Sequence, residues 1–591
     1  MEREINRKVV SYSVVAVLLA ILLATSIYYS PNFLPSFEYY FPELRTFSSY
    51  SELKYFLKTK MEQSISSKGF YAYNTFMDSF KSSPEYSTTN IQVAGVDEAD
   101  IVKTDGEYLY LVSKNNIYII RAYPPEQAEI ISKINLNETH GLEIYINGDR
   151  LIVLGACYAP SIFDSKIDDI YLPYLSAEKS FVNVYDITKR EEPVLKRMVS
   201  LNGTILGSRM IGNYVYVVFN QISTIPKING IDFEVNLPKI NSNGNIIEVK
   251  PYEISYIDVP NLYYYFSTIL AINVQNDEQE LTYETILTGM ASIIYASLNN
   301  IYLVIPNTNF LISSIGNEET LIYRIRLNEE KIVSEAQGSV PGYVLNQFSI
   351  DEYDGFFRIA TTKWTSIGQE NDLYILDMRL NIVGELKGLA PNERIYSARF
   401  MNDRCYLVTF RQVDPFFVID LSNPMEPKVL GYLKIPGFSS YLHPYDENNI
   451  IGIGMEESRV KLSLFDVTNV SAPIEKAKFT MPGQWSDTPV INEHKAFFFD
   501  KKRQLLALPV SIFYVSDGLD RKWQGAFIFD LSIDQGFILK GSITHQTDGF
   551  EYDLQVRRIL YIDEAIYTIS DGKVKINNIG DLSMIKAINL L

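Results

Sequence analysis

The chain has 591 residues, and its 71 acidic against 53 basic side chains give a formal net charge of −18. This acidity argues against general nucleic-acid binding, because neutralising phosphates requires clustered Lys and Arg side chains. A hydrophobic fraction of 47% excludes a globally disordered chain, and only 4 His and 2 Cys leave little from which to build a zinc or Cys/His active site. At roughly 100–200 residues per domain, the length predicts three to five domains unless the fold is a repeat.

The first expected element is a membrane-spanning helix, within residues 1–30. Residues 9–29 carry no charged side chain and are long enough to cross a hydrocarbon core of about 30 Å. Basic residues precede this run and none follows it before Arg45, so the positive-inside rule places residues 1–8 in the cytoplasm and the rest outside the cell. The alternative is a signal peptide cleaved near residues 24–26, which would release the same chain as a secreted protein.

Residues 31–90 are expected to form an extracellular stalk that contains one short amphipathic helix. Ser49 and Glu52 fit a capping box, with Ser49 at the N-cap and Glu52 at the third helical position. Apolar side chains follow at helical spacing. We therefore expect a helix over about residues 50–66, with its apolar face docked on the main domain.

Export bears on the two cysteines and on three asparagines. Cys157 and Cys405 could form one disulfide, although their apolar flanks favour buried free thiols. Asn137, Asn202 and Asn469 each begin an Asn-x-Ser/Thr sequence, which on an exported chain predicts possible glycosylation sites.

From residue 91 to residue 591 one β unit recurs: a polar turn followed by a strand of aromatic and β-branched residues. This hairpin occurs nine times, at residues 104–112, 147–155, 212–219, 298–305, 353–360, 402–410, 447–454, 500–510 and 563–570. Four strands can be assigned to each, which predicts a single large β-propeller. The hairpins predict nine blades. Eight is the alternative, because propellers usually have four to eight blades and one unit could be an insertion. Residues 221–262, within the third unit, are the expected insertion. Two smaller β domains or stacked sandwiches are the alternatives.

A second motif follows several of the hairpins, namely an Asp with a Pro seven positions later. The pairs are Asp186 with Pro193, Asp420 with Pro427, and Asp466 with Pro473. An Asp followed by Ser or Thr can close a turn by accepting backbone N–H hydrogen bonds. The regular spacing favours one closed ring over separate domains.

Several stretches resemble a known family of exported archaeal and bacterial proteins that carry a β-propeller domain distantly related to WD40 repeats. Residues 90–113, 399–454 and 492–510 resemble it most strongly, and residues 46–57 resemble the segment before its propeller. The resemblance implies the fold and export. The family has no established activity, so it implies no catalytic residue.

The best metal candidate is the acidic run of Asp97, Glu98 and Asp100, because closely spaced carboxylates suit Ca²⁺. The competing interpretation is that these carboxylates cap turns and pair with Lys103 or with an Arg of another blade. His443 is expected to make a structural hydrogen bond. His494 and Lys495 are expected to be ordinary polar positions of a strand.

Two functions from different classes remain open. The preferred one is a membrane-anchored extracellular propeller that binds a protein or glycan partner at the cell envelope and no nucleic acid. The alternative is an envelope hydrolase that uses carboxylates and His443 near the mouth of the propeller channel. The sequence has no G-x-S-x-G, H-E-x-x-H, C-x-x-C or P-loop motif, which favours binding over catalysis. We therefore predict no catalytic or cofactor-binding residue.

Overall fold

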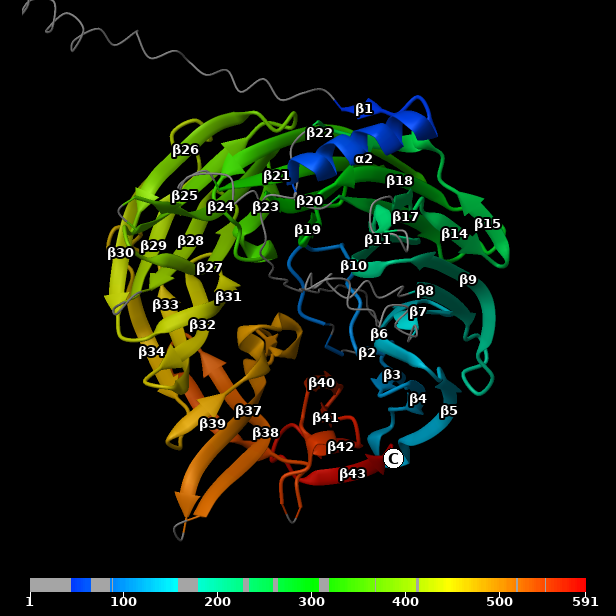
Figure 1. Cartoon of the computed structure of the whole chain (residues 1–591). Coiled ribbons are helices and arrows are strands. Elements are labelled where there is room, and N and C mark those ends of the chain that lie inside the picture. Colours follow the sequence, from blue (N-terminus) through cyan, green and yellow to red (C-terminus); the bar gives the residue numbers. More distant parts are fainter. Residues whose placement is uncertain are drawn as a thin grey trace, which may run out of the picture. The chain divides into compact units, whose positions relative to one another are not determined.

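Four-stranded antiparallel sheets, arranged around a common axis, make up almost all of the structure (Figure 1). This computed structural model describes residues 44–64, 86–87, 89–157, 179–226, 233–258, 264–307, 318–366, 368–410, 414–516, 519–547 and 549–590. Within these residues there are nine such sheets, or blades, and each of the nine predicted hairpins forms the first and second strands of one blade. The nine-bladed propeller is therefore confirmed, and the eight-blade alternative is wrong.

The blades follow one another in chain order, innermost strand first. Blades one to three consist of β2 (Val102–Thr104), β3 (Tyr108–Ser113), β4 (Asn116–Arg121) and β5 (Glu129–Asn135); β6 (Thr139–Asn147), β7 (Arg150–Cys157), β8 (Lys179–Asp186) and β9 (Val194–Asn202); and β10 (Thr204–Ile211), β11 (Tyr214–Ile222), β17 (Tyr265–Asn273) and β18 (Thr282–Thr288). Blades four to six consist of β19 (Ile293–Ala296), β20 (Asn300–Asn307), β21 (Glu319–Asn328) and β22 (Lys331–Pro341); β23 (Ile350–Tyr353), β24 (Phe356–Thr365), β25 (Gly368–Leu376) and β26 (Ile382–Leu389); and β27 (Arg394–Met401), β28 (Arg404–Phe410), β29 (Asp414–Asp420) and β30 (Lys428–Ile435). Blades seven to nine consist of β31 (Phe438–Asp446), β32 (Asn449–Glu456), β33 (Arg459–Asp466) and β34 (Ile474–Thr480); β35 (Trp485–Asp487), β36 (Phe498–Asp500), β37 (Leu505–Ser516), β38 (Leu519–Ser532) and β39 (Gly536–Ile543); and β40 (Arg558–Ile562), β41 (Ala565–Ile569), β42 (Lys573–Asn578) and β43 (Met584–Asn589).

Blade eight departs from the pattern at its inner edge. Two short strands, β35 and β36, both pair with β37, and residues 488–497 leave the sheet between them. This excursion contains the short 3₁₀ helices η5 (Pro489–Ile491) and η6 (His494–Ala496). Lys495 and His494 therefore lie in a buried turn inside the channel, and the expectation that they occupy a strand is wrong.

Local turn chemistry explains why the hairpins form. Asn402 adopts a φ of 51° and Gly148 a φ of 56°, and Asn and Gly tolerate this left-handed region best. The predicted aspartate turns are also present: the Oδ1 atoms of Asp186, Asp420 and Asp466 each accept a hydrogen bond from the backbone N–H two residues later, at 2.9–3.0 Å. Between neighbouring blades, buried β-branched, leucine and aromatic side chains form successive apolar clusters instead of one central core.

Blades one and nine close the ring without exchanging a strand. Side chains from both blades share one apolar cluster that includes Leu111, Tyr118 and Ile576. The Tyr118 hydroxyl donates to the carbonyl of Leu590 at 2.5 Å, and the Tyr567 hydroxyl donates to the carbonyl of Ala122 at 2.6 Å. Packing and side-chain hydrogen bonds therefore hold the closure.

Among the described residues, five extra strands lie between β11 and β17. They are β12 (Thr224–Pro226), β13 (Phe233–Val235), β14 (Lys239–Ser242), β15 (Asn245–Glu248) and β16 (Ile254–Tyr256). Three of them, β14 to β16, extend two neighbouring blades, whereas β12 and β13 pair with each other. β14 pairs with the outer strand of blade two, and β16 pairs in parallel with the outer strand of blade three. The same stretch of chain thus joins the rims of both blades.

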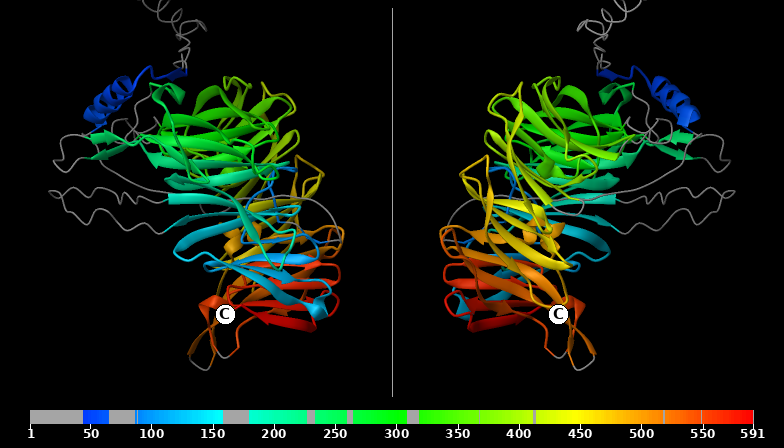
Figure 2. Two further views of the ribbon diagram at one scale, coloured as in Figure 1. Left: turned by 90° about the vertical axis from the view of Figure 1, so that its right-hand side faces the viewer. Right: turned by 90° about the vertical axis from the view of Figure 1, so that its left-hand side faces the viewer.

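The helix α2 (Tyr50–Ser64) and the strand β1 (Arg45–Thr46) lie on the outer rim beside blade three (Figure 2). The Oγ of Ser49 accepts a hydrogen bond from the N–H of Glu52 at 3.2 Å, so Ser49 is the N-cap as predicted. The Glu52 carboxylate reaches the N–H of Ser48 at 2.7 Å, one residue before the position that a capping box requires. Leu53 and Leu57 are fully buried in the apolar cluster of blade three.

Residues 9–29 lie outside the described residues, and among those described no helix is long and apolar enough to cross a membrane. Cys157 and Cys405 are both free thiols. Burial raises the pKa of the Cys405 thiol far above its usual value, so Cys405 remains protonated and unreactive.

Candidate functional site

The axial channel of the propeller is occupied by residues 89–101, here called the channel segment, which Figure 1 shows in blue in the middle of the ring. It makes isolated β-bridges with two inner strands, Asp97 with Met210 of β10 and Asp100 with Ile144 of β6. Further along the ring, the Gln92 amide donates to the carbonyls of Gln347 and Ile350 at 2.9 and 3.0 Å. The segment therefore contacts blades two, three and five before it enters β2.

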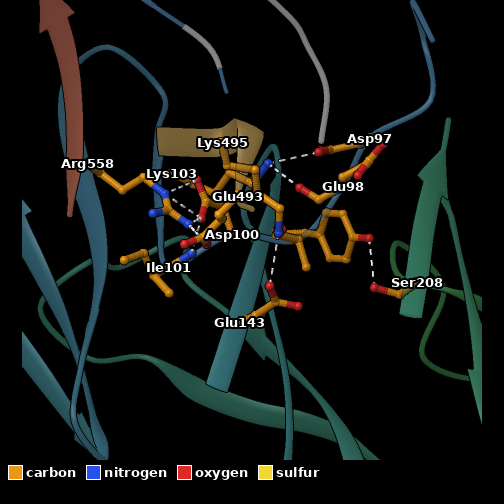
Figure 3. A network of polar contacts seen from close by, with 12 residues as sticks. Asp97, Glu98, Asp100, Ile101, Lys103, Glu143, Ser208, Glu493, Lys495 and Arg558 are labelled. Carbon is orange, nitrogen blue, oxygen red and sulfur yellow. Dashed lines mark hydrogen bonds and ion pairs between the residues drawn. The ribbon is translucent and has the colours of Figure 1, made fainter. Parts of the chain in front are cut away.

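Charged side chains of the channel segment pair with cations from several blades, and Figure 3 shows this channel cluster. Asp97 lies 2.9 Å from the Nζ of Lys103, which also donates to the carbonyl of Glu98 at 2.7 Å. Lys495 donates to the carbonyl of Ala99 at 2.6 Å and forms an ion pair with Glu143 of β6 at 3.0 Å. Each contact fixes the segment to a different part of the wall.

Asp100 and Arg558 form the most deeply buried pair of the cluster. The Nε of Arg558 lies 3.0 and 3.1 Å from the two carboxylate oxygens of Asp100, and its Nη2 lies 2.8 Å from Oδ1. Ile101 donates its N–H to the same carboxylate, and the Nη2 of Arg558 also donates to Glu493. Burial by itself raises the pKa of Asp100, but the charge of Arg558 brings it below the usual value. Asp100 therefore stays ionised inside the protein.

The buried carboxyl group of Glu98 is less well paired with a cation than that of Asp100 is. Its side chain is 1% exposed, and its Oε1 lies 3.8 Å from the Nε of Arg209, too far for a hydrogen bond. Its Oε2 has no hydrogen-bond partner among the described residues. Burial raises the pKa of Glu98 well above its usual range, with Arg209 opposing the shift. The carboxyl group of Glu98 is thus a protonatable group at the centre of the ring.

The predicted calcium ligands do not converge on one point. Asp97 faces Lys103, Asp100 faces Arg558 and Glu98 faces Arg209, so each carboxylate already has a cation of the protein. Across the described part of the chain, no group of three His, Cys, Asp or Glu side chains could hold a metal ion. The contacts agree with the competing interpretation, in which the run pairs with Lys103 and with an Arg of another blade.

His443 is half-buried, His494 is buried, and both are neutral. The Nδ1 of His443 lies 3.1 Å from the Tyr441 hydroxyl, as expected for a structural histidine, and its ring also packs against Phe497. Burial lowers the pKa of His443 to about 3, and the nearby charge of Arg399 contributes. Burial likewise lowers the pKa of His494 well below its usual value.

A cavity of about 560 Å³, here called the funnel, opens at one end of the channel. Its wall includes the turns after the inner strands of blades two and three, and its floor includes Asp97, Lys103, Lys495 and Arg558. At its rim, Arg190 bridges blades one and two by pairing with Asp149 and, at 3.4 Å, with Asp105. The funnel is therefore a polar recess of mixed charge whose floor is closed by the channel cluster.

Sequence reasoning found the carboxylates of the channel segment and their pairing with Lys103, but it missed Glu143 and Glu493 and did not identify Arg558. Arg558 stands 458 positions after Asp100, and Lys495 stands 352 positions after Glu143. The sequence pattern that could have pointed to such a partner is a charged residue next to an otherwise apolar inner strand, as Arg558 is next to ILYI. The side chains of Asn137, Asn202 and Asn469, the three predicted glycosylation positions, are all exposed.

The fold and the filled channel define a nine-bladed β-propeller closed by its own N-terminal segment. The sequence model of the family described as "Beta propeller domain" matches residues 86–582, and the chain belongs to this family. It is 33% identical over 550 residues to an uncharacterized protein of Archaeoglobus fulgidus, covering 80% of this chain and 87% of that protein. It is 31% identical over 571 residues to an uncharacterized protein of Methanocaldococcus jannaschii, covering 85% and 83%.

Solved structures are similar to this chain only at a much lower level. One is the periplasmic gluconolactonase of Pseudomonas aeruginosa, with 10% identity, a TM-score of 0.33, and coverage of 63% of this chain and 95% of that one. Another is BamB of Moraxella catarrhalis, with 14% identity, a TM-score of 0.23, and coverage of 50% and 87%. These likenesses concern the propeller fold alone.

Proposed function

We propose that this protein is a membrane-anchored extracellular propeller whose funnel binds a protein or glycan partner at the cell envelope. The observation that carries the proposal is the funnel itself, a recess of about 560 Å³ built from several blades. A recess of this size is in the range of ordinary ligand sites, about 300–1,000 Å³.

The chemistry of the funnel wall favours a polar partner. Asp105, Asp149 and Arg190 stand at its rim, and Asn147 and Asn213 line the turns beside them. Carboxylates, a guanidinium and amides can together bind the hydroxyl groups of a sugar or the backbone of a peptide. Support for the location comes from the uncharged run at residues 9–29 and its preceding basic residues.

Binding has more support than the hydrolase alternative. A hydrolytic site would need His443 within reach of a carboxylate, yet among the described residues its contacts are Tyr441, Phe497 and Phe499. The carboxylates Asp97 and Asp100 are held by cations of the protein. Neither group is placed as a general acid or base for a bound substrate.

The test is capture of the partner from intact membranes by cross-linking through the full chain, with matched variants. Asn213 and Asp403 occupy equivalent exposed turns of blades three and six, and each carbonyl accepts a hydrogen bond from the residue after the third strand. Asn213 lines the funnel and Asp403 does not. We expect Asn213→Trp to reduce capture at least tenfold and Asp403→Trp to leave it unchanged. Equal capture by both variants would overturn the funnel as the binding site.

The location has its own test. A membrane-impermeant amine label applied to intact cells should modify lysines after residue 44, such as the exposed Lys114, if the propeller is outside. Labelling that appears only after lysis would contradict export, whatever the result for the funnel.

A further inference from the structure

A second, smaller cavity lies at the other end of the channel. It has a volume of about 200 Å³ and is lined by residues 346–348, 440–441 and 490–494. Residues 346–348 and 440–441 precede or begin the innermost strands of blades five and seven, and residues 490–494 lie in the excursion of blade eight. The funnel wall, in contrast, includes the turns that follow the inner strands of blades two and three. Because inner strands run in one direction around a propeller, the two cavities face opposite sides. We call this second cavity the Gln347 pocket.

Buried polar groups of the Gln347 pocket lack partners. Gln347 is 2% exposed, and its side-chain Nε2 has no hydrogen-bond partner among the described residues, although its backbone carbonyl accepts from Gln92. His494 is 6% exposed, and its Nε2 also lacks a partner there. An unsatisfied buried donor or acceptor costs about 1–3 kcal/mol. Two such groups lining one cavity indicate that something bound there satisfies them.

Arg399 supplies the charge beside this pocket. Its guanidinium carbon lies 5.4 Å from the ring centre of Phe348, which forms part of the wall, and Phe348 in turn packs against His494 with ring centres 4.9 Å apart. The Nη1 of Arg399 is buried without a hydrogen-bond partner, and among the described residues no carboxylate forms an ion pair with it. Glu493, the carboxylate that lines the pocket, is already engaged by Arg558.

We propose that the Gln347 pocket binds a small oxyanion, the carboxylate or phosphate group of a small molecule, through Arg399, Gln347 and His494. Arg399 supplies a guanidinium, which suits planar or tetrahedral oxyanions, and the Gln347 amide supplies a neutral donor. His494 supplies a third donor, the N–H of its neutral ring at Nε2. The pocket opens to solvent beside Asn492, which is exposed. This site is separate from the funnel and does not depend on the proposed partner binding.

The experiment is a thermal-shift titration of the full chain in detergent with sodium acetate and, separately, sodium phosphate, each against sodium chloride at equal ionic strength. Binding to the folded state raises the melting temperature in a saturable way. We expect saturation with at least one of the two anions. Acetate alone would identify a carboxylate ligand and phosphate alone a phosphate ligand, and both outcomes support the site. No saturable rise with either anion would overturn it.

Three variants connect the shift to the pocket. Arg399→Gln and Gln347→Leu should each weaken the apparent dissociation constant at least tenfold. Gln347→Leu removes an unsatisfied buried amide and is therefore expected to fold even if Arg399→Gln does not. Arg394→Gln, on the same strand but exposed, should titrate like the wild type. A wild-type titration by Gln347→Leu, or an equal loss in Arg394→Gln, would refute the assignment.

Discussion

Removal of the Arg558 guanidinium is expected to destabilise the whole propeller, because it would leave Asp100 ionised and unpaired in the channel. Both side chains are at most 3% exposed, and Arg558 makes three contacts of 2.8–3.1 Å to the carboxylate of Asp100. Breaking such a buried pair typically costs about 3–5 kcal/mol. With about 2.1 cal/mol/K of unfolding entropy per residue over roughly 500 residues, Arg558→Met should lower the melting temperature by about 3–5 °C.

The assay is calorimetric melting of the wild type, Arg558→Met, and the double variant Asp100→Asn/Arg558→Met. The double variant carries no buried charge at this position, and we expect it to recover at least half of the loss. The control is Lys114→Met, because Lys114 and Asp553 also join blades one and nine but are 45% and 44% exposed. An exposed pair contributes about 0–1 kcal/mol, so this control should melt within about 1 °C of the wild type.

Two results would refute this reasoning. If Arg558→Met melts like Lys114→Met, the buried pair does not hold the channel segment in place. If the double variant is as unstable as the single variant, the loss comes from packing of the Arg558 side chain and not from an unpaired Asp100.

Three further predictions concern other parts of the chain. Burial raises the pKa of Glu284 to about 7 from its usual 4.5, so the stability it contributes is complete below pH 4.5 and is lost as the pH rises through 7. In urea denaturation, the unfolding free energy of Glu284→Gln should therefore equal that of the wild type at pH 4 and exceed it by up to about 3 kcal/mol above pH 7. A difference in unfolding free energy that does not change with pH would contradict the raised pKa. Because Asp97 is already paired with Lys103, excess EGTA should leave the melting temperature unchanged. If calcium instead raises the melting temperature and Asp97→Asn abolishes that rise, Asp97 is a calcium ligand. Leu53→Ala empties a fully buried position of α2 and should weaken helix docking by about 2–5 kcal/mol, so hydrogen exchange in α2 should become at least tenfold faster. The control Tyr55→Ala changes a side chain that is 72% exposed and should leave exchange in α2 unchanged. Equal exchange rates in the two variants would show that α2 does not dock through Leu53.

The sequence by itself determined the blades, because their signals are local. A turn such as Asn402-Asp403 and a cap such as that of Asp420 act over a few residues, and the alternation of apolar side chains sets the faces of each strand. The helix α2 was equally readable, since Ser49 caps it through a bond to a residue three positions away. Nine such hairpins therefore predicted nine blades without knowledge of any long-range contact.

Only the tertiary structure decided what fills the channel. The ion pair of Asp100 with Arg558 forms because ring closure brings the first and last blades together, and no local pattern encodes that proximity. The departure of residues 488–497 from blade eight, which carries Lys495 into the channel, has the same origin, since a buried lysine becomes stable only when Glu143 of a distant blade faces it. Pairings between side chains hundreds of residues apart depend on the closed ring, and the closed ring is a property of all nine blades at once.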